Sequence, residues 1–193
     1  MNRSYIFLAP GFEEIEALAT TDILRRAGMD VRTVAVATDG AKEVTGAHGV
    51  VVIADLLPKD VDLSVAEWLI CPGGLPGAQH LAESSFVGNA LLSHYDRGGK
   101  IAAICASPAM VLAPLGLLDG VEATCYPGMA PDNPKVKMTE EAIVVLDRII
   151  TGNGPATTIA FALAIVRKTL GDETAQNVGE GLLFYPKSPV PFN

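Results

Sequence analysis

One cysteine is a candidate nucleophile, because a predicted buried strand and a predicted helix meet at it. Residues 100–104 (KIAAI) are mainly small and β-branched apolar side chains, which predict a short buried strand. Ser107 and Pro108 follow and predict the first turn of a helix, where a proline loses no hydrogen bond. We expect the Cys105 thiol to project from the carboxyl end of the sheet, where the helix N-terminus would lower its pKa. The alternative is a small buried apolar residue without a chemical role.

Two glycines at the end of another predicted strand are candidates for binding an oxyanion. Pro72, Gly73 and Gly74 end the apolar run 68–71 (WLIC). Glycines let a ligand approach the backbone closely. The N–H groups of Gly73 and Gly74, with that of Ala106, would then face a developing alkoxide. The alternative is an ordinary tight turn; neither a phosphate-binding Gly-Lys-Ser/Thr sequence nor a dinucleotide-binding fingerprint accompanies it.

Three carboxylates, Glu13, Glu14 and Glu16, crowd the first turn of the helix predicted over 13–26. A carboxyl group beside a thiolate in a partly buried cleft has a raised pKa, through desolvation and like charge. It can therefore act as a general acid or base. The alternative is a solvated first turn that suits the helix dipole. Spacing alone does not choose which of the three faces the thiol.

The composition is that of a globular chain. Its 193 residues, 49% apolar and 19% charged, predict one domain over residues 1–193. The formal net charge of −8 argues against nucleic acid or an anionic membrane as a main partner, and no apolar run approaches the ~20 residues of a membrane span. Cys71, Cys105 and Cys125, without a signal-peptide core, predict free thiols in the cytoplasm. No cysteine–histidine spacing indicates zinc, and we expect neither a metal nor a cofactor.

The rest of the chain predicts strands that alternate with helices. Further strands are expected at 5–9, 31–36, 50–53, 123–126, 142–146 and 149–150, and further helices over 77–97 (with a break near Ser84 and Ser85), 156–170 and 173–183. Residues 38–49 predict a polar loop or hairpin, and prolines make the end, 184–191, irregular. Such alternation favours a mostly parallel sheet covered on both faces. Ligands bind beyond the carboxyl ends of such strands, where segments 10–16, 72–77 and 105–108 are expected.

Three motifs together resemble the DJ-1/ThiJ/PfpI superfamily, and most closely its DJ-1/YajL branch. They are Gly11-Phe12-Glu13-Glu14-Ile15-Glu16, Pro72-Gly73-Gly74 and Ala102-Ala103-Ile104-Cys105-Ala106, in the family's order across nearly the whole chain. The resemblance implies a flavodoxin-like three-layer α/β sandwich, with a mostly parallel sheet and a strand-to-helix nucleophile elbow at Cys105. It also implies a homodimer, and it selects Glu16 as the carboxyl group that hydrogen-bonds the cysteine.

The sequence also departs from related proteins near the cysteine. The protease-like branch has a histidine directly after the nucleophile, where this chain has Ala106, and human-type DJ-1 proteins have one where it has Tyr126. Tyrosine is a poor base near neutral pH. His48 falls near a family position often occupied by arginine, so it either lines the cleft or lies in a surface loop. His80 and His94 are expected to be solvated. All three histidines precede the cysteine, which excludes the cysteine–histidine–acid order of the related amidotransferases.

The residues and the resemblance together predict a cofactor-independent enzyme that acts on small reactive carbonyls. Cys105 would attack methylglyoxal or glyoxal, with the N–H groups of Gly73, Gly74 and Ala106 on the oxyanion. Glu16 would move the protons that rearrange the adduct to a hydroxy acid. The same chemistry on glycated thiols or amines would appear as deglycase activity. The alternative is a non-enzymatic redox sensor or chaperone-like stress protein, in which Cys105 oxidises to a sulfinate held by protonated Glu16.

Overall fold

A six-stranded sheet forms the centre of the computed structural model, which describes residues 2–36 and 40–184. The strand order is β2-β1-β5-β6-β10-β9, and neighbouring strands are parallel except for β10 and β9. The strands are β1 (Arg3–Leu8), β2 (Asp30–Ala35), β5 (Ala66–Cys71), β6 (Lys100–Ile104), β9 (Ile143–Val145) and β10 (Ile149–Gly152). The predicted mostly parallel sheet is confirmed.

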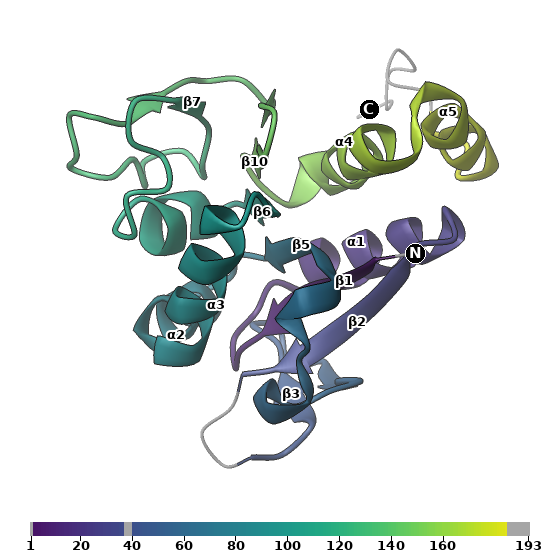
Figure 1. Ribbon diagram of the computed structural model, residues 1–193, viewed down its shortest axis with the longest axis horizontal. Coiled ribbons are helices and arrows are strands. Elements are labelled where there is room, and N and C mark those ends of the chain that lie inside the picture. Colours follow the sequence, from purple (N-terminus) through teal and green to yellow (C-terminus); the bar gives the residue numbers. More distant parts are fainter. Residues whose placement is uncertain (1, 37–39, 185–193) are drawn as a thin grey trace, which may run out of the picture.

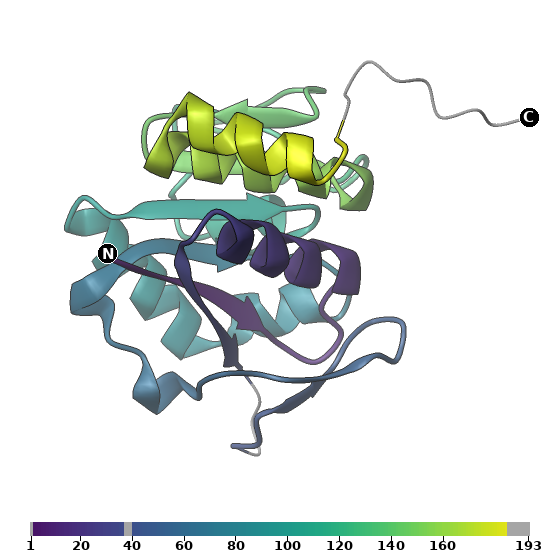
Figure 2. The same cartoon turned by 90° about the vertical axis from the view of Figure 1, so that its right-hand side faces the viewer.

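Helices cover both faces of this sheet. Figure 1 shows α2 and α3 on one side of the strands and α1, α4 and α5 on the other. The helices are α1 (Glu14–Arg26), α2 (Gly77–Glu83), α3 (Ser85–Asp96), α4 (Thr158–Leu170) and α5 (Asp172–Gly181), with single 3₁₀ turns at Pro58–Asp60, Leu63–Val65 and Pro155–Thr157. Helix α4 packs against both α1 and α5, and Figure 2 shows α4 and α5 side by side. The three-layer α/β sandwich is therefore confirmed. In the described part of the chain, no helix has the length and apolar character needed to cross a membrane.

The interior strand β1 explains why the fold has two apolar cores. Its side chains alternate between the faces of the sheet, so that Tyr5 and Phe7 join the cluster that contains the buried residues of α3. Ile6 and Leu8 join the opposite cluster, with Phe161 of α4. Full burial of such side chains contributes about 1.5–3 kcal/mol each. A strand covered on both faces has no polar alternation, which is why residues 5–8 of β1 form a continuous apolar run.

Strand register brings the predicted site segments to one edge of the sheet. Cys71, the last residue of β5, pairs with Ala103 of β6, so these neighbouring strands end almost together. Ile104, the last residue of β6, pairs with Gly152 at the end of β10. The segments after β5, β6 and β10 therefore emerge next to one another. This is the edge at which ligands bind in parallel α/β sheets.

Other predicted elements differ in length. Ser84 breaks the helix expected over 77–97, and its hydroxyl accepts the Val87 N–H at 3.4 Å in the first turn of α3. The hairpin expected near 38–49 is formed by β3 (Glu43–Thr45) and antiparallel β4 (Val51–Ile53). The strand expected over 123–126 is shorter: β7 (Glu122–Ala123) pairs only with the two-residue β8 (Lys137–Met138). Residues 37–39 of the predicted loop, and the predicted irregular end from residue 185 onward, lie outside the described residues.

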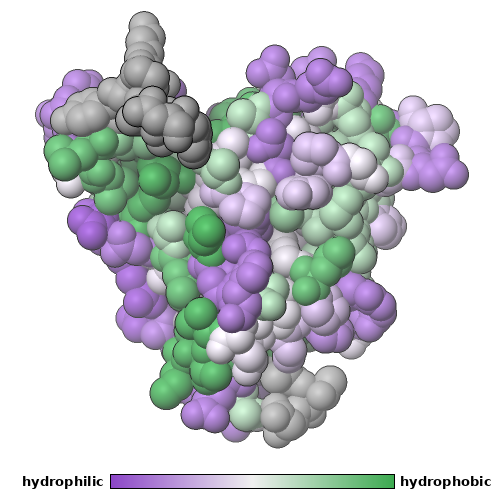
Figure 3. Space-filling model, turned by 180° about the vertical axis from the view of Figure 1, so that it is seen from behind, coloured by the Kyte–Doolittle hydropathy of each residue, from purple (hydrophilic) through white to green (hydrophobic). Residues whose placement is uncertain are grey.

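An apolar patch is exposed on the surface of α1 and the β3–β4 hairpin. Its members are Ile15, Leu18, Val50, Val51 and Ile53, and Ile53 is 70% exposed. Glu14 accepts the Val50 N–H at 3.4 Å, which holds the start of β4 beside the start of α1. Figure 3 shows hydrophobic side chains gathered at the lower left of its view, over the hairpin. We call these five residues the α1–β4 patch; contiguous exposed apolar surface often marks an interaction site.

Candidate active site

Cys105 lies at the sharp turn after β6, in a backbone conformation that L-residues rarely adopt. Its φ is +63°. Its N–H donates to the Gly152 carbonyl at 2.9 Å, and its own carbonyl accepts the Tyr126 N–H at 2.8 Å. These hydrogen bonds hold a conformation that costs about 1–3 kcal/mol. The predicted strained turn is confirmed, and turns of this kind project a nucleophile from the end of a sheet.

The helix expected after Cys105 is much shorter than predicted. It is one π-helical turn, Pro108–Leu112, followed by irregular turns to residue 120. Pro114 lacks the N–H that a continuing helix needs. Ser107, for which the sequence predicted no role beyond the helix start, anchors this segment, because its buried hydroxyl donates to the Pro72 carbonyl at 2.5 Å. The hydrogen bond ties the cysteine turn to the glycines after β5.

Glu16 is the acid that the fold brings to Cys105. It projects from the first turn of α1 and is 0% exposed. Oε2 accepts the Gly73 N–H at 2.7 Å, and the carboxylate also accepts a hydrogen bond from the Cys105 thiol. Oε1 has no hydrogen-bond partner among the described residues. The direction of α1 therefore selects Glu16, which spacing alone did not.

Gly73 allows the thiol and the carboxyl group to meet because it has no side chain. A Cβ at this position would lie 2.6 Å from Cys105 Cβ and 2.9 Å from both Cys105 Sγ and Glu16 Oε2. Gly74 is required for a different reason. Its φ is +87°, and a Cβ there would lie 2.4 Å from the backbone nitrogen of Glu13. Both positions therefore require glycine because a side chain there would clash with its neighbours at the site, whatever role the glycines have in the turn.

Burial raises the pKa of both reactive groups. Desolvation raises the pKa of Glu16 to about 7, although hydrogen bonds from Gly73 and Cys105 oppose the change. Desolvation, followed by the negative charge of Glu16, raises the pKa of Cys105 to about 12. The prediction that this pKa is lowered is wrong, because desolvation and the Glu16 carboxylate outweigh the hydrogen bonds from the Gly74 and Ala106 N–H groups, which lower it. A proton on Glu16 removes the repulsion, so the two groups titrate as a coupled pair.

Two backbone N–H groups point at the Cys105 sulfur, those of Gly74 and Ala106, and both hydrogen bonds lower its pKa. They are placed to stabilise negative charge on the sulfur or on an oxygen bound to the carbon that it attacks. The Gly73 N–H is not free for this role, because it donates to Glu16 Oε2. The expectation that the Gly73 N–H faces an oxyanion is therefore wrong for this arrangement, and the role stays a prediction for Gly74 and Ala106.

Known proteins are similar to this chain in sequence and in fold. Residues 2–168 match the model of the DJ-1/PfpI family. The chain belongs to the DJ-1/PfpI family. It is 39% identical to protein dj-1beta of Drosophila melanogaster over 180 residues, an alignment that covers 92% of this chain and 95% of the relative. It is 36% identical to glutathione-independent glyoxalase DJR-1.2 of Caenorhabditis elegans over 173 residues, an alignment that covers 86% of this chain and 87% of the relative. The solved structure of oxidized Toxoplasma gondii DJ-1 matches with a TM-score of 0.90 at 35% identity, over 95% of this chain and 99% of that one.

Tyr126 lies beside the cysteine of this DJ-1/PfpI family member. Its backbone N–H donates to the Cys105 carbonyl, while its side chain is exposed and lies near Gly154. With Cys125 and Asn153 it lines a cleft of about 440 Å³. Cys125 is buried, and desolvation raises its pKa. A cavity of about 720 Å³ between β9, α4 and α5 contains none of the predicted site residues.

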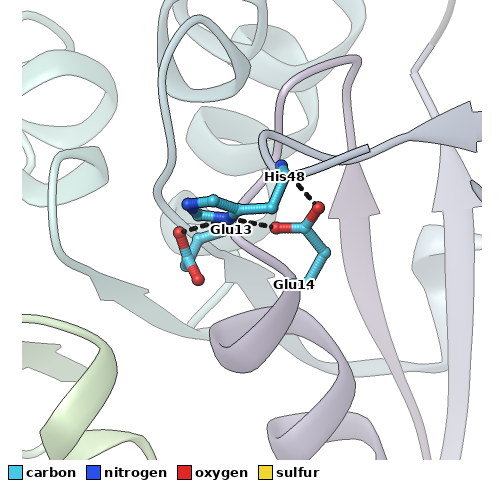
Figure 4. A group of neighbouring side chains, drawn as sticks. All are labelled: Glu13, Glu14 and His48. Atoms are coloured by element: carbon cyan, nitrogen blue, oxygen red, sulfur yellow. Dashed lines mark hydrogen bonds and ion pairs between the residues drawn. The ribbon is translucent and has the colours of Figure 1, made fainter. Parts of the chain in front are cut away.

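His48 contacts the other two glutamates of α1, as Figure 4 shows. Its side chain is 70% exposed, and Nδ1 lies 2.8 Å from Glu14 Oε2 and 3.6 Å from Glu13 Oε2. Its backbone N–H donates to Glu14 Oε1 at 2.7 Å. The hydrogen bond to Glu14 and the charges of both carboxylates raise the pKa of His48. Burial acts to raise the pKa of Glu14, but hydrogen bonds from His48 and from backbone N–H groups lower it overall.

The remaining histidines and Cys71 are structural. His94 is buried, and its Nε2 accepts the Lys100 N–H at 3.1 Å, so the prediction that it is solvated is wrong. It joins the end of α3 to β6, and burial lowers its pKa. His80 Nδ1 lies 2.8 Å from the Pro10 carbonyl oxygen. Cys71 is fully buried in the core, as expected for the end of an apolar strand, and burial raises its pKa to about 12.

Proposed function

We propose that this protein converts small α-oxoaldehydes, such as methylglyoxal, to 2-hydroxy acids without glutathione or another cofactor. The observation that carries the proposal is the buried contact between the Cys105 thiol and Glu16, with the N–H groups of Gly74 and Ala106 facing the sulfur. A nucleophile, a group that accepts and returns protons, and oxyanion donors are the parts that this chemistry needs. The name of the C. elegans relative, glutathione-independent glyoxalase, supports this choice of substrate.

In the first step, the Cys105 sulfur forms a bond to the aldehyde carbon. The thiol proton passes to the Glu16 carboxylate, to which the thiol is already hydrogen-bonded. The carbonyl π electrons move to the oxygen, which the N–H groups of Gly74 and Ala106 stabilise, and the oxygen then takes the proton from Glu16. Because the base lies next to the thiol, attack does not require a free thiolate at neutral pH. The raised pKa of Cys105 is therefore compatible with this step.

In the second step, the hydrogen on the former aldehyde carbon moves to the neighbouring ketone carbon. Glu16 removes it as a proton, which leaves an enediolate, and returns it to the adjacent carbon. The proton on the former aldehyde oxygen passes to the former ketone oxygen, so that the product is a thioester with a 2-hydroxyl group. The aldehyde carbon is oxidised by two electrons and the ketone carbon is reduced by two, so no external oxidant is needed. Water then cleaves the thioester and releases the 2-hydroxy acid and the Cys105 thiol. A carboxyl group with a pKa of about 7 accepts and donates protons at neutral pH.

Adducts of methylglyoxal with thiols or amines would present the same carbon to Cys105, and we include this deglycase-like reaction in the proposal. We assign Tyr126 a contact with the substrate from the solvent side, because its phenol is exposed beside the cleft. A phenol donates a hydrogen bond but is a poor base near neutral pH. Tyr126 is therefore not assigned a proton transfer.

Formation of lactate from methylglyoxal by the purified protein, without glutathione, tests this function. We expect turnover by the wild type and none by Cys105→Ala, because no other group would form the covalent adduct. Cys71→Ala is the matched control: it also removes a buried thiol, but Cys71 lies outside the cleft and leaves the contact between Cys105 and Glu16 intact. Wild-type turnover no faster than that of Cys105→Ala would overturn the proposal.

A second candidate function is redox sensing through Cys105. Glu16 Oε1 favours it, because this buried oxygen has no partner among the described residues and, when protonated, would donate to an oxygen added to the sulfur. Peroxide would then convert Cys105 to a sulfinate, wild-type turnover of methylglyoxal would be negligible, and Glu16→Gln would change only the oxidation product. Mass spectrometry of the peroxide-treated protein, beside the lactate assay, separates the two functions. The three free cysteines favour a reducing compartment, and we propose a cytoplasmic location.

We also propose that a second copy of this chain packs against the α1–β4 patch. Val51 and Ile53 point to the same side of β4 and are both exposed, so they offer apolar surface to a partner. Ile53→Asp places a charge in this surface, and we expect it to convert a wild-type dimer to a monomer in analytical ultracentrifugation. Val145→Asp is the control, because Val145 is 51% exposed on the edge strand β9, outside the patch. An unchanged mass for Ile53→Asp would contradict the proposed contact.

A further inference from the structure

We propose that Glu13, Glu14 and His48 form a binding site for a divalent transition-metal cation, with Zn²⁺ as the best match. The three side chains converge in Figure 4, and one ligand atom from each lies within 4.8 Å of the others. His48 Nδ1 is 2.8 Å from Glu14 Oε2 and 3.6 Å from Glu13 Oε2. Tetrahedral ligands at about 2.0–2.2 Å from Zn²⁺ lie about 3.3–3.6 Å apart. Small side-chain rotations therefore bring these three atoms to the spacing of a zinc site.

Glu13 provides independent evidence for a missing ligand. Its side chain is largely buried (11% exposed), yet its carboxylate accepts no hydrogen bond from residues 2–36 or 40–184; its nearest cationic group there is the His48 ring, at 3.6 Å. Glu14, by contrast, accepts hydrogen bonds from the backbone N–H groups of His48 and Val50 and pairs with the His48 ring. A carboxylate removed from water needs donors or a cation. The Glu13 carboxylate points into the cluster, and its partner there is the His48 ring at 3.6 Å, beyond hydrogen-bond distance.

Charge and access both favour a cation. With a neutral imidazole the cluster carries two negative charges, and the cation would replace the hydrogen bond between His48 Nδ1 and Glu14 Oε2, with the imidazole proton on Nε2. The 70% exposure of the His48 side chain leaves room for water as a further ligand. A mixed nitrogen and oxygen donor set suits Zn²⁺ and its neighbours, whereas Mg²⁺ and Ca²⁺ prefer oxygen alone.

The backbone holds the proposed ligands in place without using the reactive groups. The Glu13 N–H donates to the Gly73 carbonyl at 2.9 Å, which fixes the start of α1 beside the active cleft. Glu14 fixes the turn that carries His48. Neither Cys105 nor Glu16 contributes a ligand, so the metal site does not depend on the proposed function. Local cysteine–histidine spacing gave no sign of a metal, because Glu14 and His48 are 34 residues apart.

Titration of the Cys105→Ala protein with Co²⁺ tests the site, because this variant removes the reactive thiol and the visible spectrum of Co²⁺ reports its ligands. We expect one Co²⁺ per chain, a spectrum without thiolate charge transfer, and displacement by Zn²⁺. In the same background, His48→Gln and Glu13→Gln should each weaken binding by at least about tenfold. His80→Gln is the matched control and should bind like its parent, because His80 lies outside the cluster.

Several outcomes would overturn the metal site. They are the absence of saturable binding, equal affinities in His48→Gln and His80→Gln, or a Glu13→Gln protein that folds and binds with unchanged affinity. Thermal melts establish that each variant is folded. If Glu13→Gln does not fold, the comparison of His48→Gln with His80→Gln decides the question, since the His48 side chain is exposed.

Discussion

A single added methyl group at Gly73 should impair the reactive site more than the fold. In Gly73→Ala the new Cβ would lie 2.6 Å from Cys105 Cβ, and 2.9 Å from Cys105 Sγ and Glu16 Oε2. Ordinary contacts of a Cβ begin at 3.4 Å. The Cys105 side chain must therefore move by about 0.8 Å at its Cβ and about 0.5 Å at its sulfur, away from the position in which it meets Glu16.

Displacements of this size affect rate and stability differently. Misplacement of a reacting group by about 1 Å costs about 10²-fold in rate, so we expect kcat/KM for methylglyoxal to fall by about 10- to 100-fold. Overpacking costs about 1–3 kcal/mol of stability. For a chain of this length, each kcal/mol lowers Tm by about 2–4 °C. The Gly73→Ala protein should therefore remain folded at 25 °C.

Gly88→Ala is the matched control. Its added Cβ would lie within α3, 3.7 Å from Leu115 Cδ2, an ordinary contact, and alanine is favoured over glycine in a helix by about 1 kcal/mol. Activity should be unchanged and Tm equal or higher. The rate of Cys105 alkylation by iodoacetamide, measured by peptide mapping, reports the site without reference to a substrate. A folded Gly73→Ala protein that keeps both kcat/KM and the alkylation rate within about threefold of wild type would refute this reasoning.

The same geometry makes further predictions for Glu16, the cysteines and Tyr126. Glu16→Gln should lower kcat by about 10²–10⁴-fold in the lactate assay, the range of a general acid–base group. The folded pKa of Glu16, about 7, lies above the ordinary 4.5, so the folded protein binds more protons between these values and stability falls as pH rises from 4.5 to 7. This difference in pKa corresponds to about 3 kcal/mol of stability. Thermal melts should therefore show that Glu16→Gln is more stable than wild type at pH 8 but not near pH 4.5. Equal gains at both pH values would argue against a raised pKa of Glu16. Iodoacetamide should label Cys105 before Cys125, because the Glu16 carboxylate beside Cys105 can take the thiol proton during the reaction, and it should leave fully buried Cys71 unmodified in the native protein. Faster labelling of Cys125 in peptide maps would contradict this. Tyr126→Phe should lower kcat/KM by no more than about tenfold, the value of one hydrogen bond, and a loss as large as that in Glu16→Gln would show that the phenol moves a proton.

Local patterns in the sequence determined where the strands end and which residues form the turns after them. The apolar run 100–104 predicted β6 because a strand covered on both faces has no polar alternation. The same reasoning placed Cys105 at a strained turn and two glycines after β5, and Ser84 indicated the break between α2 and α3. Because parallel strands of one sheet end at the same edge, these local features were enough to predict the location of a site. They did not predict its chemistry in detail.

Only the tertiary structure decided which groups meet and how they ionise. Glu16 reaches Cys105 and takes the Gly73 N–H, whereas the neighbouring Glu14 turns to His48, 34 residues away. The pKa of Cys105 rises because burial and the Glu16 carboxylate outweigh the hydrogen bonds from the Gly74 and Ala106 N–H groups. Strand and helix patterns are local and repeat every two or 3.6 residues, so they can be recognised in the sequence. Desolvation, hydrogen bonds and charge interactions depend on distances through space, which the order of residues does not specify until the chain has folded.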